Sequence, residues 1–279
     1  MKRSRFVAGG IAVSAASPLP AAAGSGPVTI PEFERLEFAD EDGTVRTYYR
    51  SGSGPPVMIL HEIFGLSPDD IAFASRLAKR GFTVYAPVLF GIPNHPTGPL
   101  YSLVQAVHVC VSREFAIFAK RRSSPITVFL RALGRQIFTQ HGGRGIAVIG
   151  LCLTGGFALA MMADEHLVAP VLSEPALPFG ITPASRRSLH ITDDELACVK
   201  RRAVEGVTYL GFRFKGDCIS PVARFDRLEG ELGKESFERY DLEPTVPGSH
   251  AVFTDDYARN AATTFPAFER LVQYLLECL

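Results

Sequence analysis

The stretch Gly150-Leu151-Cys152-Leu153-Thr154-Gly155-Gly156 follows the apolar run 146–149 and decides how the rest of the chain is interpreted. An apolar run that ends in a glycine-rich segment is typical of a buried strand that turns sharply into a helix. Such a turn lifts one side chain, here Cys152, above the edge of the sheet, and the N-terminus of the following helix favours its thiolate. By itself, the stretch is equally consistent with a buried structural cysteine.

Composition narrows the class of protein. The chain has 279 residues, 47% of them apolar, and a formal net charge of zero, so it can bury a large core. Its basic clusters, at 120–122 and 200–202, are short and typical of solvated helix faces, so we expect no nucleic-acid partner. No apolar run is long enough to span a bilayer, and no internal repeat is present. These patterns predict a soluble globular protein.

The N-terminus is expected to lie outside the fold. Residues 1–5 are basic, residues 6–16 are mostly apolar, and Ala21-Ala22-Ala23 supplies the small residues that a signal peptidase requires. This pattern predicts a signal peptide over 1–23, export to the periplasm or the medium, and a single folded domain over 28–279. The alternative is a disordered extension on a cytoplasmic protein.

The cysteines give no sign of a metal site. Their number is odd, so at least one thiol stays unpaired even if export permits disulfides. No CxxC pair or Cys/His cluster has the spacing of metal ligands, and we therefore expect no metal and no organic cofactor. The five are Cys110, Cys152, Cys198, Cys218 and Cys278.

Strands and helices alternate from residue 28 onward. The pattern predicts a hairpin of strands 34–38 and 45–49 joined at Asp42-Gly43, and a helix that begins at Ser67-Pro68 and ends by Gly81. Further strands are expected at 57–61, 82–86, 146–149, 167–172, 207–214 and 237–242. Two amphipathic helical segments, broken near Ser124-Pro125, are expected before the strand at 146–149. One further helix is expected from the turn at Cys152 to residue 163, and another from Tyr257 to the C-terminus. The alternation predicts one α/β domain, a mostly parallel sheet with helices on both faces.

Polar residues follow the strands in an informative order. In parallel sheets, functional sites gather at the carboxyl ends of the strands. Asp217 follows the strand at 207–214, and His250 follows the strand at 237–242 and a loop. Nucleophile, acid and histidine is the chain order of a catalytic triad on an α/β-hydrolase sheet. The sequence therefore predicts a triad of Cys152, Asp217 and His250, in which histidine moves the proton and aspartate orients it.

From about Glu34 onward the chain resembles the dienelactone hydrolase family. The matching segments are His61-Glu62-Ile63-Phe64-Gly65, Gly81-Phe82-Thr83-Val84-Tyr85-Ala86-Pro87, Gly150-Leu151-Cys152-Leu153, Gly216-Asp217 and His250. The resemblance implies the same triad and an α/β-hydrolase domain. It also implies that Glu62 contacts the resting thiol and helps to deprotonate it, and that the backbone N–H groups of Ile63 and Leu153 form the oxyanion hole.

Three departures from the family pattern bear on the substrate. Thr154 stands where the family usually has glycine, and the signal-like N-terminus is unusual for the family. The family also holds a substrate carboxylate with two arginines, which are absent here: one position falls near Ile92 and the other is Thr254. A buried carboxylate without a cationic partner is costly, so we expect a neutral substrate.

The sequence thus predicts a cysteine-dependent hydrolase of small esters or lactones, active as a monomer. Phe64, Phe90 and Phe253 are candidates for an apolar pocket, although each is also a plausible core residue. Tyr101 and His108 fall in a segment that could cover the site. Two alternatives stay open: a non-catalytic binding protein on this fold, and a redox-active protein with a disulfide between Cys152 and Cys218.

Overall fold

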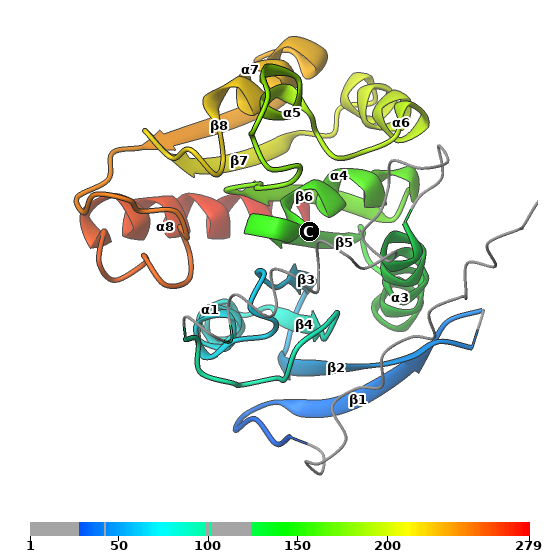
Figure 1. The fold of residues 1–279 in the computed structure, drawn as a ribbon. Coiled ribbons are helices and arrows are strands. Elements are labelled where there is room, and N and C mark those ends of the chain that lie inside the picture. Colours follow the sequence, from blue (N-terminus) through cyan, green and yellow to red (C-terminus); the bar gives the residue numbers. More distant parts are fainter. Residues whose placement is uncertain (1–27, 42, 99–100, 102–123) are drawn as a thin grey trace, which may run out of the picture.

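The computed structural model describes residues 28–41, 43–98, 101 and 124–279. They form an eight-stranded sheet in the order β1-β2-β4-β3-β5-β6-β7-β8 (Figure 1). β2 pairs antiparallel with β1 and β4, and the pairs from β4 to β8 are parallel. The strands are β1 (Glu34–Ala39), β2 (Val45–Gly52), β3 (Pro56–Leu60), β4 (Thr83–Pro87), β5 (Ile146–Leu151), β6 (Leu167–Ser173), β7 (Tyr209–Phe214) and β8 (Phe237–Leu242).

Helices cover both faces of this sheet (Figure 1). One apolar cluster packs α1 and α8 against one face, through Phe73 and Leu271 among others. A second cluster packs α3, α4, α6 and α7 against the opposite face, through Leu130, Leu159 and Phe225 among others. The α-helices are α1 (Pro68–Lys79), α3 (Pro125–His141), α4 (Gly155–Ala160), α5 (Pro183–Arg187), α6 (Asp193–Val204), α7 (Val222–Leu232) and α8 (Ala261–Cys278). The structure confirms the predicted α/β architecture.

The central strands are buried along their whole length because both faces are covered. Each residue of β3, β4, β5 and β7 is buried, which explains why these strands are mainly apolar rather than alternating, with Arg213 of β7 as the charged exception. The hairpin β1–β2 is more exposed, and its fully buried residues are Tyr48 and Tyr49 of β2. None of the described helices is long and apolar enough to cross a membrane.

Helix boundaries that depend on local chemistry agree with the sequence. Ser67 caps α1 in a capping box with Asp70, and Pro68 occupies the first turn. The closing helix differs, because it begins at Ala261 rather than at Tyr257. Residues 251–260 form turns instead, in which the side chain of Asn260 accepts hydrogen bonds from the N–H groups of Thr245 and Val246. Helices α5, α6 and α7 were not predicted.

Some predictions concern residues that the structure does not describe. The signal peptide over 1–23, Asp42 of the hairpin turn, Cys110, and His108 with the first amphipathic segment lie outside the described residues. Those predictions remain untested.

Candidate active site

The turn after β5 places Cys152 in a strained conformation. Its φ is 48°, in the left-handed region that non-glycine residues rarely adopt. Two glycines allow the tight turn: a Cβ on Gly150 would lie 2.5 Å from the carbonyl oxygen of Thr154, and one on Gly155 would lie 2.6 Å from the Cβ of Pro175. Strained backbone of this kind is concentrated at functional sites. The glycines of the opening stretch are therefore explained by close approach.

Thr154 ties the turn to the neighbouring strand. Its hydroxyl accepts a hydrogen bond from the N–H of Leu151 at 3.0 Å and lies 2.7 Å from the carbonyl oxygen of Leu60, to which it donates. Leu60 ends β3, the strand that leads to Glu62 and Ile63. The departure from the family glycine thus adds a hydrogen bond between the two loops that flank the nucleophile.

The helix after Cys152 is not the continuous helix to 163 that the sequence suggested. A 3-10 turn over Cys152–Thr154 leads into the short α4, and a second 3-10 turn spans Met161–Ala163. Cys152 is only 7% exposed. Burial raises the pKa of the Cys152 thiol, and the charge and hydrogen bond of His250 only partly reverse that effect. The resting nucleophile is therefore mainly a protonated thiol at neutral pH.

The structure brings Cys152, His250 and Asp217 into one hydrogen-bonded chain. The Nε2 of His250 lies 3.1 Å from the Sγ of Cys152, and its Nδ1 lies 2.7 Å from Oδ2 of Asp217. Burial lowers the pKa of His250, but the charge of Cys152 in its thiolate form, together with the hydrogen bond and charge of Asp217, outweighs burial and raises this pKa well above its usual value. These are the nucleophile–base and base–acid contacts that a triad requires.

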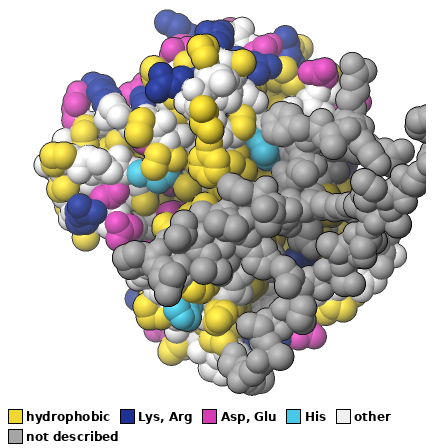
Figure 2. Space-filling view, in the orientation of Figure 1, with side chains coloured by type: hydrophobic (Ala, Val, Ile, Leu, Met, Phe, Trp, Pro, Cys, Tyr) yellow, Lys and Arg dark blue, Asp and Glu magenta, His cyan; other side chains and the backbone are white. Residues whose placement is uncertain are grey.

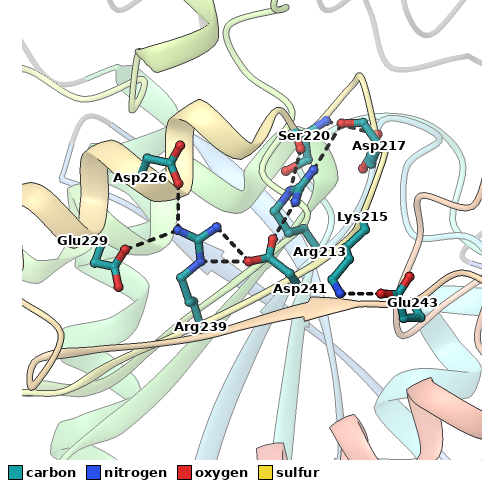
Figure 3. Close-up of polar contacts among 9 residues, drawn as sticks. All are labelled: Arg213, Lys215, Asp217, Ser220, Asp226, Glu229, Arg239, Asp241 and Glu243. Carbon is teal, nitrogen blue, oxygen red and sulfur yellow. Dashed lines mark hydrogen bonds and ion pairs between the residues drawn. The ribbon is translucent and has the colours of Figure 1, made fainter.

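Backbone donors and a buried arginine fix Asp217. Its Oδ1 accepts hydrogen bonds from the N–H groups of Ile219 at 2.8 Å and Ser220 at 3.2 Å. From β7, the guanidinium of Arg213 donates to the carbonyl oxygens of Ser220 and Asp217, at 2.9 and 3.4 Å (Figure 3). Asp241 on β8 pairs with Arg213 at 2.5 Å. Because Arg213 is almost fully buried, this loop is held from beneath by charge-assisted hydrogen bonds.

The loop that carries His250 is held by side chains from its own C-terminal end. Oδ2 of Asp256 accepts the N–H groups of His250 at 2.7 Å and Ala251 at 3.2 Å. The amide of Asn260 donates to the hydroxyl of Ser249 at 2.9 Å, one residue before the histidine. The backbone around His250 is therefore anchored on both sides of the catalytic ring.

Glu62 is buried and contacts Thr254. The Thr254 hydroxyl donates a hydrogen bond to Oε1 of Glu62, where the family pattern would place an arginine. Burial raises the pKa of Glu62, whereas Thr254 and the charge of His250 lower it less strongly. The loop is also held by Asp70, whose Oδ1 accepts the N–H of Glu62 at 3.3 Å. Burial therefore disfavours the ionised form of Glu62, and Thr254 and His250 oppose this effect only in part.

The segments that carry Ile63 and Leu153 start side by side. Leu60, the last residue of β3, is in register with Gly150, the last but one of β5, and Ile63 and Leu153 each lie three residues further along the chain. His61 braces the first of them: its Nε2 accepts the N–H of Leu89 at 3.0 Å, which leaves Nδ1 to donate to the carbonyl oxygen of Glu62. Burial lowers the pKa of His61 to about 4, consistent with this neutral tautomer.

The three candidate pocket phenylalanines differ in their burial. Phe64 and Phe90 are partly exposed, and Phe90 packs edge-on against His61 with ring centroids 4.6 Å apart. Phe253 is fully buried and stacks on Phe73 of α1 at 5.3 Å. Phe253 is therefore a core residue, and its assignment to the pocket was wrong: the turn after His250 directs it towards α1 and α8. Figure 2, in the orientation of Figure 1, shows hydrophobic side chains gathered towards the middle of the view and basic ones at its upper edge.

Several residues that shape the site were missed from sequence. Glu174, directly after β6, is fully buried. The charges of His250 and Glu62 shift its pKa, and its own charge raises the pKa of Cys152. An isolated acidic residue after a strand gives too little signal to assign, although strand-end placement was the one available clue. The cysteines Cys152 and Cys218 are both free. Within the described ranges, no group of three or more His, Cys, Asp or Glu side chains could hold a metal ion.

The fold and this arrangement together define a class. A mostly parallel sheet with a nucleophile on the turn after β5, an acid after β7 and a histidine after β8 is the α/β-hydrolase arrangement. The model of the dienelactone hydrolase family matches residues 44–173, slightly less than half of the chain. The resemblance that the motifs indicated is thereby confirmed: this part of the chain carries the sequence pattern of the dienelactone hydrolase family.

Individual relatives agree with this assignment. A carboxymethylenebutenolidase of Rhodococcus opacus is 30% identical over 114 residues, which span 40% of this chain and 40% of the relative. A Klebsiella pneumoniae structure assigned to dienelactone hydrolase superposes with a TM-score of 0.61 at 18% identity, covering 88% of this chain and 98% of that one. A dienelactone hydrolase-like promiscuous phosphotriesterase from metagenomic libraries gives 0.59 at 17% identity, covering 87% and 98%. At these identities, the two structures show the shared fold.

Proposed function

We propose that this protein is a cysteine-dependent hydrolase of small, neutral carboxylic esters or lactones. The observation that carries the proposal is the continuous chain of hydrogen bonds from Asp217 through His250 to Cys152. Such a chain lets one imidazole accept the thiol proton, deliver it to the leaving group and later activate water.

The reaction has two halves. In the first, Sγ of Cys152 bonds to the substrate carbonyl carbon, the thiol proton passes to His250, and the C–O bond to the leaving alcohol breaks as that oxygen takes the proton. In the second, His250 removes a proton from water, the resulting hydroxide attacks the thioester carbon, and the C–S bond breaks to release the acid as Sγ takes the proton back from His250. The N–H groups of Ile63 and Leu153 would hold the oxyanion in both halves.

Burial of the thiol makes its deprotonation the critical step. Because burial raises the pKa of Cys152, the thiolate must be generated as the substrate binds. Glu62 could assist this deprotonation, because the charge of His250 lowers its pKa and the Thr254 hydroxyl donates a hydrogen bond to its carboxyl group. The replacement of the family arginine by Thr254 leaves no cation at that position for a substrate carboxylate, which supports a neutral substrate.

The proposal is tested by turnover and by trapping the acyl-enzyme. We expect hydrolysis of nitrophenyl acetate, nitrophenyl butyrate or γ-butyrolactone, lost by about 10³-fold or more in Cys152→Ala. The peptide containing Cys152 should gain the acyl mass during turnover. Cys198→Ala, which removes a thiol on α6, is the matched control and should retain wild-type rates.

Two results would contradict the proposal. Equal rates for Cys152→Ala and wild type would exclude the cysteine as nucleophile. A clear preference for an anionic dienelactone over the neutral substrates would contradict the inference from Thr254.

A further inference from the structure

Glu174 combines three features that a buried acidic residue rarely shows together. It follows the last residue of β6, has no exposed surface, and has a φ of 36° in the left-handed region. A long side chain in this conformation is strained, and such strain persists only where the surrounding structure imposes it. Here the N–H of Glu174 donates to the carbonyl oxygen of Phe212 at 2.8 Å, and the N–H of Ala176 donates to that of Cys152 at 2.8 Å.

The side chain of Glu174 reaches the histidine loop. Its Oε2 accepts the N–H of Val252 at 3.3 Å and is also hydrogen-bonded to the hydroxyl of Ser173. Its Oε1 is buried and has no hydrogen-bond partner among the described residues. A buried oxygen without a partner costs stability, so this site keeps an acid at some expense where an apolar residue would fit the core better.

Two carboxyl groups together hold three successive backbone amides. Asp256 takes the N–H groups of His250 and Ala251, and Glu174 takes the next one, that of Val252. Asp256 lies in the same loop as His250, whereas Glu174 directly follows β6. Glu174 is therefore the contact that attaches this part of the loop to the end of β6, beside the strand that leads to Cys152.

We propose that Glu174 is a positioning residue for His250: its buried carboxyl group fixes Val252 to the end of β6 and so keeps the imidazole within hydrogen-bonding distance of Cys152. The inference deepens the proposed function, because it assigns a residue to the support of the same triad. It requires the acceptor oxygen of Glu174 and not its charge.

The electrostatic surroundings agree with an uncharged group. Burial raises the pKa of Glu174 well above its usual value, the charge of His250 lowers it, and Glu62 raises it further. With two partners on Oε2, the proton belongs on Oε1. An amide at this position would therefore reproduce both the neutral state and the acceptor.

The experiment uses three substitutions at this position. Glu174→Gln keeps a neutral acceptor, Glu174→Met keeps the approximate size without one, and Glu174→Gly removes the side chain while relieving the left-handed backbone. Glu195→Met is the matched control, because Glu195 is also a buried glutamate and accepts the N–H of Thr192 at 2.8 Å, on α6. Thermal unfolding would be measured for all four variants to compare their stability losses.

The decisive readout is the rate at which iodoacetamide alkylates Cys152 between pH 6 and 10, measured on its own peptide by mass spectrometry. His250 lowers the pKa of the thiol, so a displaced imidazole reduces the thiolate present at a given pH. We expect Glu174→Met and Glu174→Gly to slow alkylation at pH 8 by about tenfold, Glu174→Gln to stay within about threefold of wild type, and Glu195→Met to leave the rate unchanged. In ester hydrolysis, the same two variants should lower kcat with little change in KM.

Two outcomes would overturn the inference. One is a wild-type alkylation profile in Glu174→Met or Glu174→Gly, which would leave Glu174 without influence on the histidine. The other is a rate for Glu174→Gln as low as that for Glu174→Met, which would mean that the acid itself is needed. Because alkylation requires no substrate, the result is independent of whether the protein hydrolyses esters.

Discussion

Asp217, Glu174 and Glu62 follow the carboxyl ends of β7, β6 and β3, but the pKa of Asp217 and those of the two glutamates are shifted in opposite directions. Burial would raise the pKa of Asp217, yet the hydrogen bond and charge of His250, with the N–H groups of Ser220 and Ile219, outweigh it and lower that pKa. For both glutamates, burial prevails and the pKa is raised. The hydrogen bond and charge of His250 and two backbone donors lower the pKa of Asp217, whereas burial outweighs the hydrogen-bond donors of Glu62 and Glu174 and raises their pKa values.

Carboxyl groups therefore have two different roles in this site. An ionised Asp217 stabilises the imidazolium that forms when His250 takes a proton. Because burial raises the pKa values of Glu62 and Glu174, their charged forms are disfavoured beside a developing thiolate. The three predictions below test this division, in order of decreasing effect.

The largest effect is expected from removing the ionised acid. Asp217→Asn should lower kcat by on the order of 10³- to 10⁴-fold, because an amide can neither stabilise the imidazolium nor fix the required tautomer. Glu62→Gln removes only the assistance to thiol deprotonation, so its loss of kcat should be about ten- to a hundredfold. Steady-state kinetics with one ester would compare the two; an equal or larger loss in Glu62→Gln would reject the division.

An intermediate effect is expected from the arginine beneath Asp217. Arg213→Met removes the donors to the carbonyl oxygens of Ser220 and Asp217, which should loosen the acid and lower kcat by about ten- to a hundredfold. Arg202→Met is the matched control, since Arg202 is equally buried and donates to carbonyl oxygens at the amino end of β6, away from the site.

Both arginine variants should lose thermal stability, but only Arg213→Met should lose kcat beyond the fraction of protein that is unfolded. A proportionate loss of kcat in Arg202→Met would show that global stability, rather than the position of Asp217, explains the effect.

The smallest effect concerns Asp70, another buried acid, whose side chain accepts the N–H of Glu62. Burial, and then the nearby charge of Glu62, raise the pKa of Asp70 to about 8. The folded state therefore binds a proton that the unfolded state releases, so this contribution to stability is complete below about pH 4 and is lost as the pH rises towards 8. From pH 7 to 8, wild type should lose on the order of 1 kcal/mol of unfolding free energy relative to Asp70→Asn.

Urea unfolding of both proteins at several pH values would measure this difference. Parallel curves for wild type and Asp70→Asn would mean that Asp70 is ionised in the fold, as Asp217 is, and that its three hydrogen-bond donors, from Ser67 and Glu62, outweigh its burial.

The sequence by itself determined the alternation of strands and helices, the capped start of α1, the turn at Cys152, and the order of Cys152, Asp217 and His250. These features are local: apolar periodicity, a capping box and glycines at a tight turn act within a few residues. The motif resemblance to the dienelactone hydrolase family was also present in the sequence and is confirmed by the family match.

Only the tertiary structure decided which side chains support the site and which acids are charged. Glu174 meets Val252 across 78 positions in sequence, and Glu62 meets Thr254 across 192, so no local pattern encodes either contact. The burial of Phe253 against α1 and the later start of α8 were decided in the same way. Charge states depend on desolvation and on donors contributed by distant segments, and these exist only once the sheet has assembled.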